Sequence, residues 1–490
     1  MSEFILKMKR LKGLELFLAF ITPLVLLFAL GQHSTLAMLL LLGVCVSFLL
    51  QRFKQIKSVF LVLFAFILFG LDFPIYGGSQ ITLPTEPLAA ILFIMVLFEF
   101  YREKEFLIQI IKQPISIGLL LLLFIWMASS ITSSMPTISF KYTLVNTVFL
   151  VGAVGGSILL LKKYNFDFRH LYLLSILPLL FFGLYSIYTL LPYHFNPGAA
   201  PLIAQPFFKD HTIYSASIAL FVFPLLLWPI YNPKSNKNYL ISAIGVLLLV
   251  SLFISSSRAA WLSIIVSGLF IGFIYFGGKA KHLFLIGIAA LTMLWFNSKS
   301  IENTFLINPY SSSETDGSLQ DQALSVTNVN SDVSNIERLN RWRCALRMGM
   351  DKPLTGFGPA TFPFQYLVYQ RESEMTYISV TNPFNTILGR GGSAHSEYLL
   401  LLSESGWIGF ITWMGLQFIF LFSFFKIWNS ALTLNEKKLS LVMYISLLTY
   451  TIHSLFNNYL GNAAFSIAYW TTCGGLLFYS VRATDSPKHD

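Results

Sequence analysis

Charged side chains are scarce in this sequence. Asp, Glu, Lys and Arg make up 11% of its 490 residues, whereas hydrophobic residues make up 55%. An average soluble domain carries about 25% charged residues, so the composition excludes that class. It predicts an all-α polytopic membrane protein, because helices satisfy their own backbone hydrogen bonds in lipid.

Cysteine is also rare. The sequence contains three, Cys45, Cys344 and Cys473, of which the first and last fall within predicted membrane spans. This arrangement predicts no disulfide framework. We expect the thiols to be buried or inert.

Long apolar runs recur along the chain. Because about 20 apolar residues cross a hydrocarbon core, the runs predict about 12–14 transmembrane helices. The first run leads into further spans with no small-residue cleavage site after it, so it is expected to be a membrane helix and not a removable signal peptide. The runs lie near 13–31, 36–50, 58–71, 87–101, 114–131, 143–161, 171–191, 213–231, 239–256, 260–277, 282–297, 407–425, 439–456 and 463–481.

Basic residues predict the orientation of these spans. With the N-terminus inside, 22 of the 33 Lys and Arg residues fall on the cytoplasmic side, and the short outer connections hold only Lys141, Lys209 and Arg258. This asymmetry follows the positive-inside rule. The net charge of +10 is then a topology signal, and no nucleic-acid motif accompanies it.

The spans divide the chain into three parts. Transmembrane helices with short loops are expected over 1–297, a large outer loop over 298–406, and further transmembrane helices over 407–490. The loop begins with a Ser-, Asn- and Asp-rich stretch typical of a mobile segment. Next, Ser334 and Glu337 have capping-box spacing and predict a helix that ends near Asp351, before Pro353.

This loop helix brings Arg338, Arg341 and Trp342 onto one face and Arg343 and Arg347 onto another. Two arginines one turn apart beside a Trp could hold a diphosphate, because guanidinium groups match phosphate oxygens and stay charged. The alternative is an amphipathic helix on lipid head groups.

Two short outer connections add polar residues to the same membrane face. Arg258 lies where two apolar runs meet, and it either extends to the interface or faces an anionic head group. Lys209, Asp210 and His211 precede another span, where such residues are more often caps or interface residues than catalysts. The glycines at 391 and 392 predict a sharp turn that delivers His395 to this face, followed by a short helix before the span at 407.

Three stretches carry a family resemblance: "SSSRAAWL" at 255–262, "ERLNRWRCALRMGMDKPLTGFGPATF" at 337–362 and "AHSEYLLLLSESGWIG" at 394–409. Together with the many spans and the large outer loop, they resemble the O-antigen ligase and polymerase superfamily, which includes bacterial O-linked protein oligosaccharyltransferases. The resemblance runs from about 207 to 409.

The resemblance implies a GT-C-like enzyme of the bacterial inner membrane with its active site, and the large loop, facing the periplasm. Such enzymes transfer a glycan from undecaprenyl diphosphate to a hydroxyl of lipid A-core, another glycan or a protein, with inversion and without a metal. Residue by residue, Arg258 matches the short-loop arginine, Arg338 the arginine four before the loop Trp, and His395 the histidine of H-x-x-Y-L. Where many relatives have an arginine before the helix at 213, this chain has Lys209.

The residue types suit this chemistry. Fixed arginines can stabilise the negative charge that develops on a departing diphosphate, and the outer loops contain no D-x-D motif, so we expect no metal and no cofactor. His395 could take the proton of the acceptor hydroxyl or bind the diphosphate, with Glu397 as the second candidate for the base. Glu404 is expected to be structural.

Two questions stay open at this point. A lipid-glycan flippase would also need many spans, but transporters usually keep ionisable residues at membrane depth, and these spans contain few. Among enzymes, the motifs are shared by ligases, polymerases and protein glycosyltransferases. We favour O-antigen ligation to lipid A-core, because the single large loop and the H-S-E-Y-L form look most like that branch.

Overall fold

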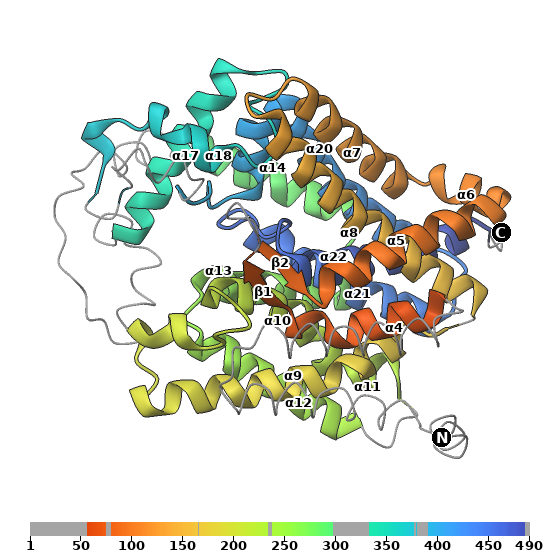
Figure 1. The fold of residues 1–490 in the computed structure, drawn as a ribbon. Helices are drawn as coiled ribbons and strands as arrows, with labels where there is room; N and C mark the ends of the chain where they lie inside the picture. The colour runs from red at the N-terminus through yellow and green to blue at the C-terminus, as the bar shows by residue number, and fades with distance from the viewer. Residues whose placement is uncertain are drawn as a thin grey trace, which may run out of the picture.

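The computed structural model describes residues 56–74, 80–164, 166–233, 238–296, 333–376, 379 and 391–485 (Figure 1). The expected spans 13–31 and 36–50, Cys45 and the Ser- and Asn-rich stretch of the outer loop lie outside these residues. Cys344 and Cys473 are buried free thiols, as expected.

Helices make up nearly all of the described secondary structure, which confirms an all-α polytopic membrane protein. Each apolar run expected from 58 onward overlaps a helix or a pair of helices. Among the described residues, five stretches are long and apolar enough to cross a membrane by length and composition: Pro114–Ile131, Pro136–Lys163, Arg169–Tyr193, Arg258–Tyr275 and Glu397–Trp428. The main helices are α4 (Ile56–Phe66), α5 (Thr85–Arg102), α6 (Lys104–Ile111), α7 (Pro114–Ile131), α8 (Pro136–Lys163), α9 (Arg169–Leu190), α10 (His211–Leu226), α11 (Trp228–Tyr231), α12 (Asn238–Ile254), α13 (Arg258–Tyr275), α14 (Ala280–Phe296), α17 (Val333–Asp351), α18 (Phe362–Gln365), α20 (Glu397–Trp428), α21 (Leu434–His453) and α22 (Ala463–Asp485).

The helices pack side by side with their buried apolar residues in one continuous core. α22 lies along α8, and α10 lies against both α12 and α21. The largest fully buried side chains in the described core include Trp126, Trp228, Trp413 and Trp470. Many large apolar side chains on the outer faces remain exposed, among them Phe98, Phe124 and Leu269, as expected of helices that face lipid.

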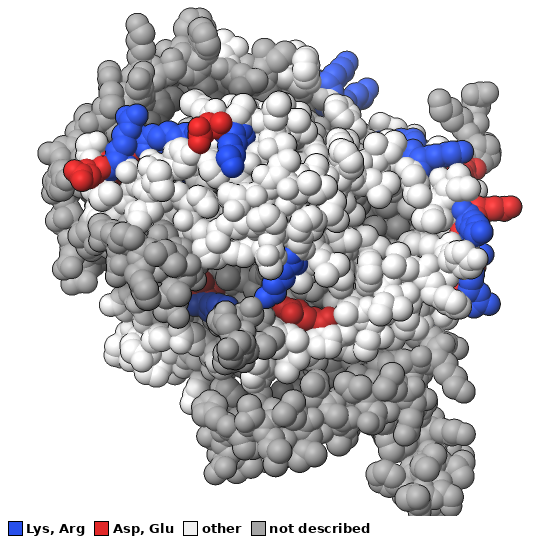
Figure 2. Space-filling view, turned by 45° about the horizontal axis from the view of Figure 1, so that its top comes forward, with Lys and Arg blue, Asp and Glu red and all other residues white. Residues whose placement is uncertain are grey.

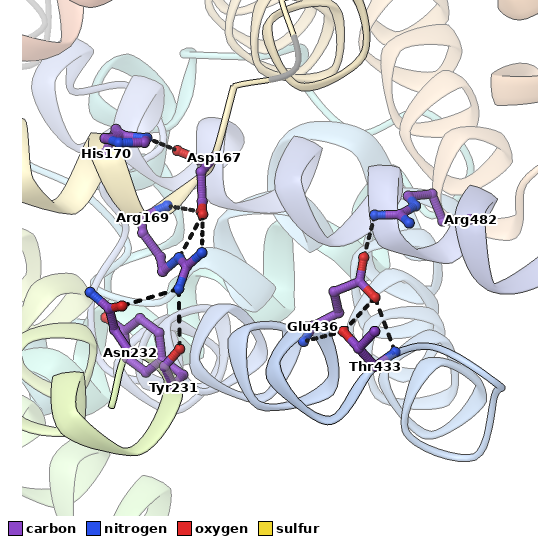
Figure 3. A network of polar contacts seen from close by, with 8 residues as sticks. All are labelled: Asp167, Arg169, His170, Tyr231, Asn232, Thr433, Glu436 and Arg482. Atoms are coloured by element: carbon purple, nitrogen blue, oxygen red, sulfur yellow. Dashed lines mark hydrogen bonds and ion pairs between the residues drawn. The ribbon is translucent and has the colours of Figure 1, made fainter. Parts of the chain in front are cut away.

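One end of the bundle carries ion pairs among residues expected on the cytoplasmic side. Lys163 pairs with Glu99 over 2.5 Å, and Lys162 lies 3.9 Å from Glu103. Figure 3 shows two further groups: Asp167 binds Arg169, which also reaches Asn232, and Glu436 binds Arg482 while completing a capping box with Thr433. These pairs join α5 to α8 and α21 to α22, so residues of one predicted side of the membrane do meet.

The opposite end holds α17 and α18, drawn at the upper left of Figure 1, away from α6 on the right. A small antiparallel hairpin, β1 (Leu71–Pro74) and β2 (Gln80–Leu83), was not expected from the sequence. Figure 2 shows the charged side chains of one face gathered in a few groups, with broad uncharged surface between them. The division into 1–297, 298–406 and 407–490 and the count of 12–14 spans stay predictions.

Candidate active site

The predicted loop helix is α17, which begins at Val333 and ends at Asp351. Its two arginine faces separate as the spacing predicts. Arg343 and Arg347 both approach Glu374 on one side. On the other side, Arg341 and Ala345 are buried. The helix packs against α20, so one face of α17 contacts the helix that follows His395.

Arg341 has a structural environment. Its Nε donates to Glu337 Oε1 over 3.1 Å, and its Nη1 donates to the carbonyl oxygens of Gly391 and Ser393 over 2.9 and 3.1 Å. Its guanidinium also lies 5.2 Å from the ring centre of Tyr366. With only 7% of its surface exposed, Arg341 holds the 391–393 loop against α17.

The loop needs glycine where it passes this arginine. Gly392 has a φ of +83°, and a Cβ there would lie 2.5 Å from Arg341 Nη1. Both the left-handed backbone and the close approach favour glycine. The sharp turn predicted from the glycines is therefore present at 392.

The turn delivers His395 to α17. The indole Nε1 of Trp342 donates to the His395 carbonyl oxygen over 3.2 Å, and His395 itself has a φ of +50°. Left-handed conformations at residues other than glycine cost free energy and cluster at functional sites. The surrounding contacts thus impose one backbone conformation on the histidine.

The environment of His395 favours its neutral ring. Burial, followed by the nearby charges of Arg341 and Arg338, lowers the pKa of His395 to about 4, against opposing effects of Asp210 and of a hydrogen bond with Asn457. A desolvated site beside two cations disfavours a third positive charge. The ring is therefore neutral at neutral pH and able to accept a proton.

Asn457 and a second histidine belong to this site although the sequence did not single them out. The Asn457 side chain contacts His395, and its Nδ2 lies 3.1 Å from Nε2 of His453. His453 is the last residue of α21, and both residues are almost fully buried. The stretch "HSLFNNY" at 453–459 places several polar residues at the end of a predicted span. This polar cluster is the sequence signal that could have indicated a functional role for His453 and Asn457.

The start of α10 also belongs to the site. Asp210 caps the helix, its Oδ1 accepting from the Thr212 N–H over 2.6 Å, and lies 3.3 Å from His211 Nδ1. Asp210 and Arg338 both act electrostatically on His211 and on His395. Asp210 and His211, which precede or begin α10, are therefore neighbours of Arg338 and His395 from the large outer loop.

Arg258 is the first residue of α13 and follows a sharp turn. Ser256 has a φ of +55°, and the Trp261 Nε1 donates to the Leu252 carbonyl oxygen over 2.8 Å, which ties the turn together. Ser255 Oγ lies 2.7 Å from Ser215 Oγ on α10. Arg258 is half-buried, and its turn lies beside the first turn of α10.

Lys209 has an acidic partner on the hairpin. Its Nζ lies 2.8 Å from Asp72 Oδ2 on β1, and 60% of its side chain is exposed. Asp72 in turn accepts from Thr82 Oγ1 on β2. The lysine thus joins the hairpin to the segment that precedes α10.

Glu397 is an internal anchor. It is 2% exposed, and its Oε2 accepts from the Tyr450 hydroxyl over 2.6 Å and from the Tyr459 N–H over 3.1 Å. Its own N–H donates to the Ser454 carbonyl oxygen over 2.9 Å. These contacts join the start of α20 to the segment between α21 and α22.

Glu404 joins the second motif to the third, in agreement with a structural role. Its carboxylate accepts from the N–H groups of Ala360 and Phe362 over 2.8 and 3.0 Å. α20 is interrupted at Gly406, which has a φ of +68° and where a Cβ would lie 2.5 Å from the Pro353 carbonyl oxygen. The short helix expected before the span at 407 is therefore present.

Acidic residues and histidines do not form a metal centre within the described ranges. No group of three or more His, Cys, Asp or Glu side chains there could hold a metal ion. The outer loop contains two pairs of acidic residues with one residue between them, at 314/316 and at 372/374. Glu374 of the second pair binds Arg347, and residues 314 and 316 lie outside the described part of the chain. The charged groups around His395 are two arginines and one aspartate.

The three motifs coincide with a known family. Residues 243–414 match the family model described as O-Antigen ligase, a range that contains all three stretches, and this confirms the resemblance to that superfamily. The match supports a glycosyltransferase of the O-antigen ligase or polymerase type in a multi-pass membrane protein. No curated protein matches the sequence significantly.

Proposed function

We propose that this chain transfers a glycan from undecaprenyl diphosphate to a hydroxyl acceptor, with lipid A-core as the acceptor. The observation that carries the proposal is the placement of His395. Its ring is neutral, its backbone is fixed by Trp342, and Arg338 lies within electrostatic reach. All three residues lie in stretches of the family match.

Arginine stabilises the leaving group in this mechanism. When the sugar–oxygen bond breaks, the diphosphate departs with the electron pair, and a fixed guanidinium stabilises the new charge in a partly dehydrated site. Arg338 and Arg258 take this part, since each lies at the end of the bundle that carries His395. Arg341 positions the loop instead, and Lys209 supports the hairpin through Asp72.

His395 acts as the general base. As the acceptor oxygen forms its bond to the anomeric carbon, the hydroxyl proton moves to the neutral imidazole, and attack opposite the leaving diphosphate inverts the configuration. Glu397 is enclosed by Tyr450 and Tyr459, so it supports the site and does not meet the acceptor. Asp210 and His211 border the site from α10.

The orientation of the chain follows from its basic residues. The α6 end of the bundle carries Lys162, Lys163 and Arg482, and the positive-inside rule assigns that end to the cytoplasm. The opposite end, with His395, then faces the periplasm of a bacterial inner membrane. Donor and acceptor lipids both reach it from the bilayer.

Reconstitution tests the proposal directly. Purified protein in proteoliposomes receives undecaprenyl-diphosphate-linked glycan and lipid A-core, and mass spectrometry follows the product. We expect a new glycosidic bond, formed equally well in excess EDTA. Movement of the donor across the bilayer without a new bond would indicate a flippase, and activity lost to EDTA and restored by magnesium or manganese would contradict the metal-free mechanism.

The acceptor is tested in a deletion strain. A ligase predicts that long glycan polymer persists but is no longer attached to lipid A-core. Loss of the polymer itself would indicate a polymerase, and loss of glycan from proteins would indicate a protein O-oligosaccharyltransferase.

A further inference from the structure

We propose that Asn457 and His453 are positioning residues that fix the ring orientation and the proton position of His395. This inference rests on the proposed function, in which His395 is the general base and its unprotonated ring nitrogen must face the acceptor. It concerns residues outside the matched stretch 243–414.

The three side chains form a chain of contacts across two parts of the fold. His395 precedes α20, His453 ends α21, and Asn457 lies in the segment between α21 and α22. The Asn457 amide contacts His395 and lies 3.1 Å from His453 Nε2. His453 and Asn457 are 1% and 2% exposed, whereas His395 as a whole residue is half-buried.

The chemistry of an amide between two imidazoles sets the proton positions. A neutral imidazole has one N–H and one lone pair. If the Asn457 carbonyl accepts the His395 N–H, the other ring nitrogen of His395 keeps its lone pair for the acceptor proton. The Asn457 Nδ2 then donates to the unprotonated Nε2 of His453.

The hydrogen bond with Asn457 raises the pKa of His395. The other charged groups that act on the ring are Arg341 and Arg338 on α17, which disfavour protonation, and Asp210 at the start of α10, which favours it. Asn457 therefore provides a neutral partner that orients the ring without creating a permanent imidazolium.

The segment that carries Asn457 is itself fixed. Glu397 accepts from the Tyr459 N–H and donates its own N–H to the Ser454 carbonyl oxygen. The Tyr459 hydroxyl binds Thr212 Oγ1 on α10. An acidic residue two positions after His395 thus serves the histidine indirectly, by anchoring the loop that orients it.

The test measures the protonation of His395 itself. Diethyl pyrocarbonate modifies neutral histidine, and mass spectrometry of the His395 peptide gives the rate as a function of pH in wild type and in Asn457→Asp. A carboxylate partner favours the imidazolium, so we expect the midpoint to rise by about 1 pH unit or more. Asn458→Asp, one residue further on, is the matched control and should shift it less.

A second pair of variants tests His453. His453→Gln keeps an acceptor for Asn457, whereas His453→Phe does not. We expect kcat to fall roughly tenfold or more in His453→Phe with KM for the donor little changed, and Gln to restore most of the rate. If Asn457→Asp does not fold, the comparison of these two His453 variants alone tests whether His453 and Asn457 position His395.

An unchanged His395 midpoint in Asn457→Asp, or equal rates in the two His453 variants, would overturn the inference. Modification of His395 requires no glycan substrate. A shifted midpoint in a protein without transferase activity would therefore refute the proposed function and leave the contact between the two residues intact.

Discussion

The indole of Trp342 binds the backbone carbonyl of His395 over 3.2 Å, so the second motif of this chain holds the third. The carbonyl belongs to a residue with a φ of +50°. A hydrogen bond at that position stabilises a backbone conformation that the histidine would otherwise rarely adopt.

Trp342→Phe is expected to slow transfer by roughly tenfold, because it keeps the ring and removes only the Nε1–H, and small misplacements of catalytic groups are costly. Transfer by purified, monodisperse protein gives the answer. Trp407→Phe is the control, since the Trp407 side chain is partly exposed at the α20 kink. Equal rates for wild type and Trp342→Phe would show that His395 does not need this bond.

Arg258→Ala and Arg338→Ala should each reduce transfer by roughly tenfold or more, because a charge-assisted contact to a buried anion is worth about 1.5–3 kcal/mol. Lysine should rescue poorly, since it lacks the planar fork. Arg343→Ala, on the other face of α17 near Glu374, should leave the rate unchanged. Wild-type turnover in a folded Arg258→Ala, Arg338→Ala double variant would exclude both arginines from donor binding.

Arg341→Ala should mainly destabilise the protein. Removing one partner of a buried ion pair costs about 3–5 kcal/mol, and Glu337 would be left without its arginine. We therefore expect a lower thermal unfolding midpoint for Arg341→Ala than for Arg338→Ala in detergent. An unchanged midpoint together with lost diphosphate binding would instead make Arg341 a donor ligand, as first expected from its spacing.

Periodicity and turn signals predict much of this structure. The apolar runs from 58 onward locate the helices, the glycine pair locates the turn at 392, and the spacing of the arginines separates the two faces of α17. These features depend on local sequence, which fixes helical faces and turns.

The roles within the site depend on contacts between distant segments. Spacing places Arg341 beside Arg338, but only the fold brings it to Glu337 and to the 391–393 carbonyls. The sequence also does not show that Lys209 meets Asp72 of the hairpin or that Glu397 meets Tyr450 of α21. Asn457 and His453 carry no motif, so their proximity to His395 emerges only from packing.

The pH profile should follow the neutral form of His395. The ring must be unprotonated to accept a proton, and its pKa of about 4 lies well below the ordinary value of 6.5. We expect kcat/KM, which reports the free enzyme, to hold from pH 7 to about pH 5 and to fall toward pH 4. Arg338→Gln removes a cation, which raises the pKa of His395 and should move the fall in kcat/KM to higher pH. If the fall stays at the same pH in Arg338→Gln, the charge of Arg338 does not act on His395.

The most direct test of His395 as the base compares wild type with His395→Gln in reconstituted transfer and donor binding. Glutamine keeps hydrogen-bonding capacity but cannot take the acceptor proton. The rate should fall by roughly 10²–10⁴-fold, the usual contribution of a positioned acid or base, with donor affinity little changed. Restoration of most of the rate by glutamine, or loss of donor binding in proportion to rate, would show that His395 binds the diphosphate and is not the base.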